Sequence, residues 1–303
     1  MKLFIFTFAV NDKFPIDIQY KQFKKYLQDD FEFIIFNDAF DTNTVHSIDK
    51  IAQNINVKCV RVPQKIHKDN QNPSEAYAET LNWASRVYAL NDDHDTILLV
   101  HTDIFPIRTV SVLDILGSHQ IASVMESRPF LNTSIEYIYP TFTILKISEL
   151  KDKIHQLDFA GGKINAVASN SENNNTYSRD ASNIYYYTDN LNYNELVMGL
   201  DTGAMTGYFI KRYPETIKYL DQLQVRDVFN KEITDENAEK FKYTSLISFF
   251  ESNNEICTQY GLSPGWITNG FYHYIAGSQW NSRNNLVFQQ GHNLRGELFK
   301  KYF

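Results

Sequence analysis

The chain has 303 residues, enough for a large α/β domain, and a formal net charge of −7 with no basic run longer than a pair of lysines. This charge argues against nucleic acid or an anionic membrane surface as a partner, because proteins bind both through clusters of positively charged side chains. Two cysteines are too few for a disulfide framework, and no apolar run is long enough to span a bilayer. We therefore expect a cytoplasmic protein without a membrane span.

The first hundred residues alternate between strand and helix patterns. Residues 1–10 have the charge and apolar stretch of a weak signal peptide, but they lack a small-x-small cleavage site, so a buried first strand is expected. A helical stripe follows from residue 16, and Asn72-Pro73-Ser74-Glu75 provides an N-cap, a first-turn proline and a glutamate that start another helix. Strands are expected at 3–10, 31–38, 57–62 and 96–100, and helices at 16–27, 48–55 and from 73. This alternation predicts an α/β fold with a mostly parallel sheet flanked by helices.

The second part of the chain has a mixed pattern. Residues 161–195 are rich in Asn, Ser and Tyr with little periodicity, which indicates a loop insertion. Other expected elements are a short helix near 113, strands at 121–125 and 139–147, and helices at 212–223, 236–252 and 294–302. We expect a single domain over 1–303, with a nucleotide-binding half at 1–110 and an acceptor-binding half at 111–303.

Polar residues follow three of the predicted strands, at the sheet edge where ligands of parallel sheets collect. These residues are Thr7 to Asp12, Asn37-Asp38 and His101-Thr102-Asp103. The first strand is not followed by Gly-x-Gly, and the chain contains no Walker-type loop, so a diphosphate would have to be held by a cation. Carboxylate and imidazole ligands suit Mn²⁺, and Mg²⁺ also favours carboxylate oxygen.

Three segments carry a resemblance to a known family. "LLVHTDIFPI" resembles the DxD strand end of GT-A glycosyltransferases, and "HYIAGSQW" is similar to the late histidine segment of their glycogenin-like members. "GLDTGAM" is loosely similar to the Asn-Ser-Gly-Val segment of the same enzymes. The resemblance implies a GT-A-like, Rossmann-type fold and a hexosyl- or pentosyltransferase that moves a sugar from a nucleotide-sugar donor, UDP-linked in the first instance, to a glycan or other hydroxyl acceptor.

The resemblance also implies roles for single residues. Asp103 and His273 would be the metal ligands, for Mn²⁺ or Mg²⁺, and His101 stands where the family has its first aspartate. Arg283 would replace the family's lysine on the diphosphate. Asp201 would be the carboxylate base on the acceptor if the reaction inverts the anomeric centre. The remaining expected contacts are Thr7, Phe8, Asn11, Asn37 and Asp38 to the nucleoside, and Gly203, Gly277 and Trp280 to the sugar or acceptor.

Other interpretations remain open for these residues. Asp103 can simply cap a turn, His273 can be a packed core histidine, and Asp201 can initiate a turn before Thr202-Gly203. A catalytically silent carbohydrate-binding protein is the main alternative function. A sugar-phosphate nucleotidyltransferase is a further one, although "FTFAVNDKFP" lacks the glycine-rich basic loop of that group. His292 and Arg295 are expected at the surface or at a helix end.

Overall fold

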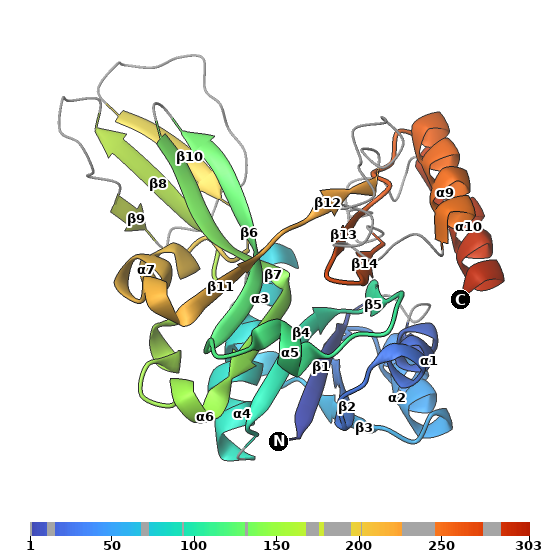
Figure 1. Ribbon diagram of the computed structural model, residues 1–303, viewed down its shortest axis with the longest axis horizontal. Helices are drawn as coiled ribbons and strands as arrows, with labels where there is room; N and C mark the ends of the chain where they lie inside the picture. Colours follow the sequence, from blue (N-terminus) through green and yellow to red (C-terminus); the bar gives the residue numbers. More distant parts are fainter. Residues whose placement is uncertain are drawn as a thin grey trace. The chain divides into compact units, whose positions relative to one another are not determined.

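The computed structural model describes residues 2–10, 16–67, 73–92, 94–130, 133–167, 176–178, 195–200, 202–225, 246–274 and 286–303. The fold is α/β, and its main sheet has seven strands in the order β11-β6-β7-β4-β1-β2-β3 (Figure 1). These strands are β1 (Leu3–Ala9), β2 (Phe31–Asn37), β3 (Lys58–Arg61), β4 (Thr96–His101), β6 (Ile121–Phe130), β7 (Thr133–Lys146) and β11 (Ile217–Leu220). The strands β6 and β7 are antiparallel, and the sheet is otherwise mostly parallel, which confirms the predicted fold class.

Two smaller sheets accompany the main one. One has the order β12-β13-β14-β5 and contains β5 (Ile104–Pro106), β12 (Leu223–Gln224), β13 (Trp266–Thr268) and β14 (Phe271–His273). The other has the order β10-β8-β9 and contains β8 (Gly162–Val167), β9 (Thr176–Ser178) and β10 (Glu195–Leu200). The segment 161–195, predicted to be a loop, therefore contains two strands. β8 is the central strand and pairs with both β9 and β10, and such tertiary pairing leaves little periodic signal in a polar segment.

The helices follow the predicted pattern in the first hundred residues and deviate from it later. They are α1 (Ile16–Tyr26), α2 (Thr42–Asn54), α3 (Pro73–Trp83), α4 (Ala89–Asn91), α5 (Val112–Leu116), α6 (Ile147–Leu150), α7 (Thr206–Arg212), α9 (Ile247–Tyr260) and α10 (Leu286–Tyr302). A π-helical turn, Ala84–Tyr88, joins α3 to α4. The side chain of Asp41 caps α2 by accepting a hydrogen bond from the Thr44 amide at 2.8 Å.

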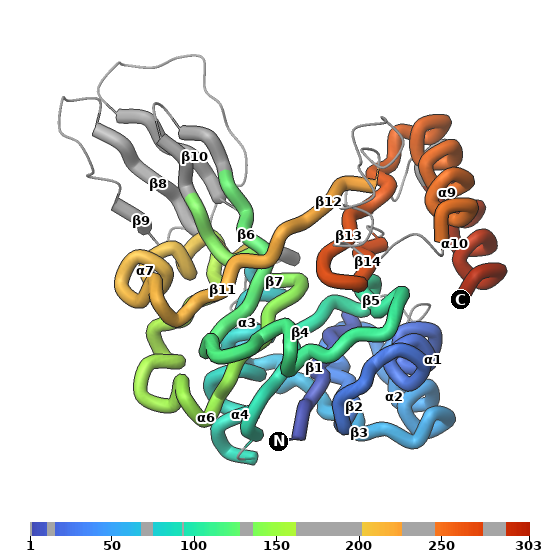
Figure 2. The backbone as a smooth tube through the Cα atoms, in the orientation of Figure 1, coloured from blue at the N-terminus to red at the C-terminus, as the bar shows by residue number. Residues whose placement is uncertain are grey.

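The predicted helix over 212–223 is wrong. The helix α7 ends at Arg212, a 3-10 turn follows at Pro214–Thr216, and β11 then occupies Ile217–Leu220, a course that Figure 2 traces along the gold tube. Pro214 lacks the amide hydrogen that a helix interior requires, so the helix ends before it. The predicted helix at 236–252 lies partly outside the described residues, and in the described part α9 begins at Ile247. The closing helix, α10, starts at Leu286 rather than near 294.

The chain divides into two compact units. The first unit contains residues 1–6, 60–99 and 116–219, and the second contains residues 7–59, 100–115 and 220–303. The predicted division of the domain at residue 110 remains a prediction. In the second unit, α9 and α10 lie side by side (Figure 1), and their aromatic side chains join β5, β13 and β14 in one core. Among the described residues, no helix is both long and apolar enough to cross a membrane.

Candidate functional site

The residue pair expected to bind a metal meets in the second unit. Strand β5 follows Asp103 directly and pairs antiparallel with β14, so that Ile104 lies opposite His273. The Asp103 carbonyl also accepts a hydrogen bond from the Tyr274 amide at 2.8 Å. This pairing places His273 Nε2 3.3 Å from Asp103 Oδ1, and each residue is 3% exposed. The expected proximity of the two side chains is therefore confirmed, whereas their role as metal ligands remains a prediction.

A second imidazole contacts the same carboxylate. His101 Nδ1 lies 2.6 Å from Asp103 Oδ1, and the His101 side chain is 27% exposed. Burial raises the pKa of the Asp103 carboxyl, but the charges and hydrogen bonds of His101 and His273 outweigh burial and hold this pKa far below its usual value. Asp103 is consequently a carboxylate at neutral pH, with two imidazole nitrogens directed at one of its oxygens.

The turn that carries Asp103 is held by a buried glutamine that the sequence analysis did not identify. Gln19, in α1, is fully buried, and its Nε2 donates to the His101 carbonyl at 2.8 Å and to the Ile104 carbonyl at 2.6 Å. Its Oε1 accepts a hydrogen bond from the Thr7 hydroxyl at 2.8 Å. Both N–H groups of the amide are therefore used on the two sides of Asp103, which fixes the end of β4 relative to β1 and α1.

The orientation of His273 has its own support. The Trp266 ring packs edge-on against the imidazole, with ring centroids 4.8 Å apart and an interplanar angle of 67°. The residue before it, Gly265, has φ +95°, and a Cβ at this position would lie 2.1 Å from the His273 carbonyl oxygen. Only glycine is accommodated there, so the close approach of the two strands that hold His273 depends on it.

The residues predicted to contact the nucleoside have partners inside the protein. The Thr7 hydroxyl binds Gln19, and the Phe8 ring stacks on Phe36 at 5.2 Å. The Asn37 amide donates to the Val45 carbonyl at 3.0 Å and to Asp49 Oδ1 at 2.9 Å. Asp38 is 1% exposed. These contacts explain why polar residues are tolerated at the ends of β1 and β2, and binding of a base by the same residues remains a prediction.

Several predicted site residues cannot be placed. Asn11, Asp201, Gly277, Trp280 and Arg283 lie outside the described residues. Within the described part of the chain, no group of three or more His, Cys, Asp or Glu side chains is arranged to hold a metal ion. Asp103 and His273 would thus leave most of a cation's coordination shell to water or substrate oxygen.

Gly203 belongs to the predicted acceptor segment and lies in the first unit. It has φ +97°, and a Cβ there would lie 2.4 Å from the Ile138 carbonyl oxygen. Its amide donates to the Phe159 carbonyl at 2.7 Å, and its carbonyl accepts a hydrogen bond from Thr206 Oγ1 at 2.6 Å. The glycine is thus required by close backbone packing, and contact with a sugar or acceptor remains a prediction.

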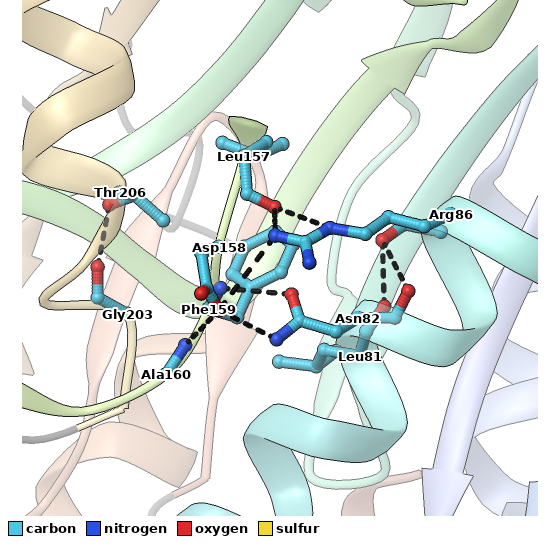
Figure 3. Close-up of polar contacts among 10 residues, drawn as sticks. Leu81, Asn82, Arg86, Leu157, Asp158, Phe159, Ala160, Gly203 and Thr206 are labelled. Atoms are coloured by element: carbon cyan, nitrogen blue, oxygen red, sulfur yellow. Dashed lines mark hydrogen bonds and ion pairs between the residues drawn. The ribbon is translucent and has the colours of Figure 1, made fainter. Parts of the chain in front are cut away.

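The segment packed on Gly203 is anchored to the helical region 73–91 (Figure 3). Arg86 Nε and Nη2 both donate to the Leu157 carbonyl, the former at 3.0 Å. Asn82 donates to Asp158 Oδ1 at 2.8 Å and accepts a hydrogen bond from the Phe159 amide at 3.0 Å. Arg86 lies within the π-helical turn, which therefore presents the guanidinium to the segment 157–160.

Another difference from the sequence analysis concerns Arg295, which was expected at the surface or at a helix end but lies in the interior of α10. It is 1% exposed, and its Nε donates to Asn253 Oδ1 at 2.9 Å, while the guanidinium lies 4.3 Å from the centroid of the Tyr274 ring. The planar guanidinium can satisfy both contacts at once, which explains an arginine in an aromatic core. It ties α10 to α9 and to the residue that follows His273.

Comparisons with known proteins give the following result. No family model matches the chain, and no curated protein matches it. Among solved structures, the chain is similar to the mannosyltransferase Ktr4p from S. cerevisiae, with 11% identity and a TM-score of 0.37 over 50% of this chain and 58% of that one. It is also similar to the mannosyltransferase PcManGT from Pyrobaculum calidifontis in complex with GDP-Man and Mn²⁺, with 11% identity and a TM-score of 0.32 over 50% and 46%.

A third similar structure is core-mannan synthase A from Aspergillus fumigatus in its Mn/GDP form, with 10% identity and a TM-score of 0.35 over 50% and 61%. The matched region covers roughly half of the length of these structures. All three are glycosyltransferases, the class that the sequence motifs resemble. Scores this low leave any functional assignment to the arrangement of the chain's own residues.

Proposed function

We propose that the protein is a glycosyltransferase that moves a sugar from a nucleotide-sugar donor, UDP-linked in the first instance, to a hydroxyl acceptor with the help of a divalent cation. The observation that carries this proposal is the buried contact between Asp103, at the end of β4, and His273, which lies 170 residues further along the chain (273 − 103). The contact lies at the carboxyl end of a strand of a mostly parallel sheet, where ligands of such folds bind.

The donor set fits Mn²⁺, and less well Mg²⁺, because a carboxylate oxygen and an imidazole nitrogen are both ligands that Mn²⁺ accepts. Two neighbouring ligands of one octahedral ion, each at about 2.1 Å, are separated by about 3.0 Å. The observed 3.3 Å between Asp103 Oδ1 and His273 Nε2 is close to this value. When bound, the cation would neutralise the charge that develops on a departing diphosphate.

The protein's own residues would prepare and support this site. Gln19 fixes the carbonyls on both sides of Asp103, and Trp266 fixes the ring of His273. Among His101, Asp103 and His273, the side chain of His101 is the most exposed, so we expect His101 to contact a nucleotide ribose or phosphate. Asp201 is proposed as the base that accepts the acceptor's proton, should the reaction invert the anomeric centre.

A second candidate is a carbohydrate-binding protein without transferase activity. The observation that favours it is the 2.6 Å contact of His101 with Asp103, since a carboxylate engaged by two imidazoles needs no metal to be stable in a buried position. The two candidates differ in whether a nucleotide binds only when Mn²⁺ is present.

The test is the thermal unfolding midpoint with UDP, GDP and CDP, each with and without Mn²⁺. A ligand at a hundred times its Kd adds about 2.7 kcal/mol to the stability of the native state, which a thermal scan resolves easily. We expect one diphosphate to raise the midpoint only together with Mn²⁺, and Asp103→Asn to abolish this shift. Asp114→Asn, an exposed carboxylate in α5, is the matched control. Absence of any nucleotide shift in the presence of Mn²⁺ would favour the carbohydrate-binding candidate.

A further inference from the structure

A basic pocket lies in the first unit, formed by α7 and the turn before Leu157. It has a volume of about 480 Å³ and is lined by Gln156, Tyr208, Phe209, Lys211 and Arg212. This volume is within the range of about 300–1,000 Å³ that small-molecule sites occupy. The pocket combines two cations, two aromatic rings and one amide, whereas the whole chain carries a net charge of −7.

Arg212, which lines the pocket, and Lys153, which lies outside its lining, both approach the ring of Tyr213. Lys153 Nζ lies 4.9 Å from the centroid of the Tyr213 ring, and the Arg212 guanidinium carbon lies 5.5 Å from it. Across the described residues, neither Lys153 nor Arg212 forms an ion pair with a carboxylate. Both positive charges therefore attract an anion to this side of the pocket. Carboxylates do occur nearby in the sequence, at Asp152 and Glu215.

The walls of the pocket are fixed before any ligand binds. The Tyr213 hydroxyl donates to Gln156 Oε1 at 3.2 Å, and its ring packs on Phe209, which is 1% exposed, at 4.9 Å. Gln156 precedes Leu157, whose carbonyl accepts the two hydrogen bonds from Arg86 (Figure 3). Because these groups are already ordered, a ligand pays little conformational entropy in them on binding.

The mixture of groups distinguishes between kinds of anion. Tyr208 is 45% exposed, and an aromatic side chain beside an amide suits the apolar face and hydroxyls of a pyranose ring. Arg212 offers the planar pair of N–H donors that a carboxylate or phosphate accepts. We propose that this pocket binds an acidic saccharide unit, such as a uronate or a sugar phosphate, independently of the nucleotide site proposed above.

The experiment measures binding of tetragalacturonate to the full chain by calorimetry, without nucleotide or metal, and compares it with the fully methyl-esterified and therefore neutral tetrasaccharide. We expect only the charged form to bind, with an affinity that falls as salt is added. Arg212→Gln and Lys153→Gln should each weaken binding by up to about fivefold, which is the upper end for one exposed ion pair. Tyr208→Ala should weaken it further, and Lys24→Gln, an exposed lysine in α1, should leave it unchanged.

Three outcomes would overturn the proposal. Equal binding of the neutral tetrasaccharide would remove the role of charge. Equal binding of an oligoglutamate of the same charge would show that the pocket recognises charge and not a sugar. An equal loss of affinity in Lys24→Gln would show that net charge, rather than this pocket, attracts the ligand. Circular dichroism of each variant shows whether it is folded, and none of these outcomes depends on nucleotide binding.

Discussion

Replacement of Gln19 by leucine tests whether the turn that carries Asp103 is held in place from α1. Leucine has a similar size but removes the hydrogen bonds to the His101 carbonyl, the Ile104 carbonyl and the Thr7 hydroxyl. A buried hydrogen bond contributes about 1 kcal/mol net, so the three together contribute about 3 kcal/mol. In a chain of this size, 1 kcal/mol shifts the thermal midpoint by about 2 °C, and we expect Gln19→Leu to lower it by about 6 °C.

The assay has two readouts, because a variant at a purely structural residue would lower the stability of the protein without changing the nucleotide site. Chemical denaturation gives the free energy of unfolding, and the Mn²⁺-dependent shift of the midpoint with nucleotide reports on the site itself. Hydrogen exchange at residues 102–104 shows whether the turn loosens even if no nucleotide binds. Gln22→Leu is the matched control, since Gln22 is 2% exposed in the same helix but donates to the Phe303 carbonyl, at 3.4 Å.

The two readouts separate the possible errors. If Gln19→Leu lost about 3 kcal/mol while the nucleotide shift and the exchange at 102–104 stayed as in the wild type, Gln19 would stabilise the fold without positioning Asp103. If the variant were as stable as the wild type, the hydrogen bonds assigned to Gln19 would be wrong. If wild type showed no nucleotide shift, the proposed function would fail, and hydrogen exchange would still decide the role of Gln19.

Two further predictions concern the same site. Gly265→Ala should destabilise the protein by at least about 2 kcal/mol in chemical denaturation, because alanine is strained at a positive φ and its Cβ would clash with the His273 carbonyl. The control is Gly261→Ala, with φ +67° at the end of α9, which should cost about 1 kcal/mol. The free energy of unfolding should differ most between wild type and Asp103→Asn near pH 5, and the difference should shrink as the pH falls below about 3.9. The reason is that the pKa of Asp103 is lowered in the folded state, so its contribution to stability is lost on protonation. A difference that grew in acid would contradict the lowered pKa.

The order and type of the early elements follow from local pattern. Each of β1, β2 and β4 is an apolar run that is buried over most of its length, and α1 and α2 carry an apolar stripe. These signals are local, so a period of two or 3.6 residues is sufficient to find them. The segment after residue 200 lacks such a stripe, and there tertiary contacts decide between helix and strand, as they do at β11.

The site was partly predictable for the same reason. Asp103 is visible because it interrupts an apolar run at a strand end, and His273 because its segment resembles a known one. Gln19 had a weaker signal that was missed: it lies three residues after Ile16 and four before Phe23, so it occupies the buried face of α1. A glutamine on an apolar helix face has to be satisfied by a partner, and this requirement could have indicated a polar target opposite it.

Gly265, Trp266 and Arg295 show what no local pattern contains. The need for glycine at 265 arises from the His273 carbonyl, which is adjacent only after β13 and β14 have paired. Arg295 is read as a surface residue because arginine usually is one, and only the packing of α10 on α9 places its guanidinium over Tyr274. Gly265 and Trp266 contact His273 itself, and Arg295 contacts Tyr274, the residue that follows it. The orientation of this candidate ligand is therefore set by contacts that the chain makes only after folding, which is why a sequence motif can indicate the ligand but not the geometry that would make it one.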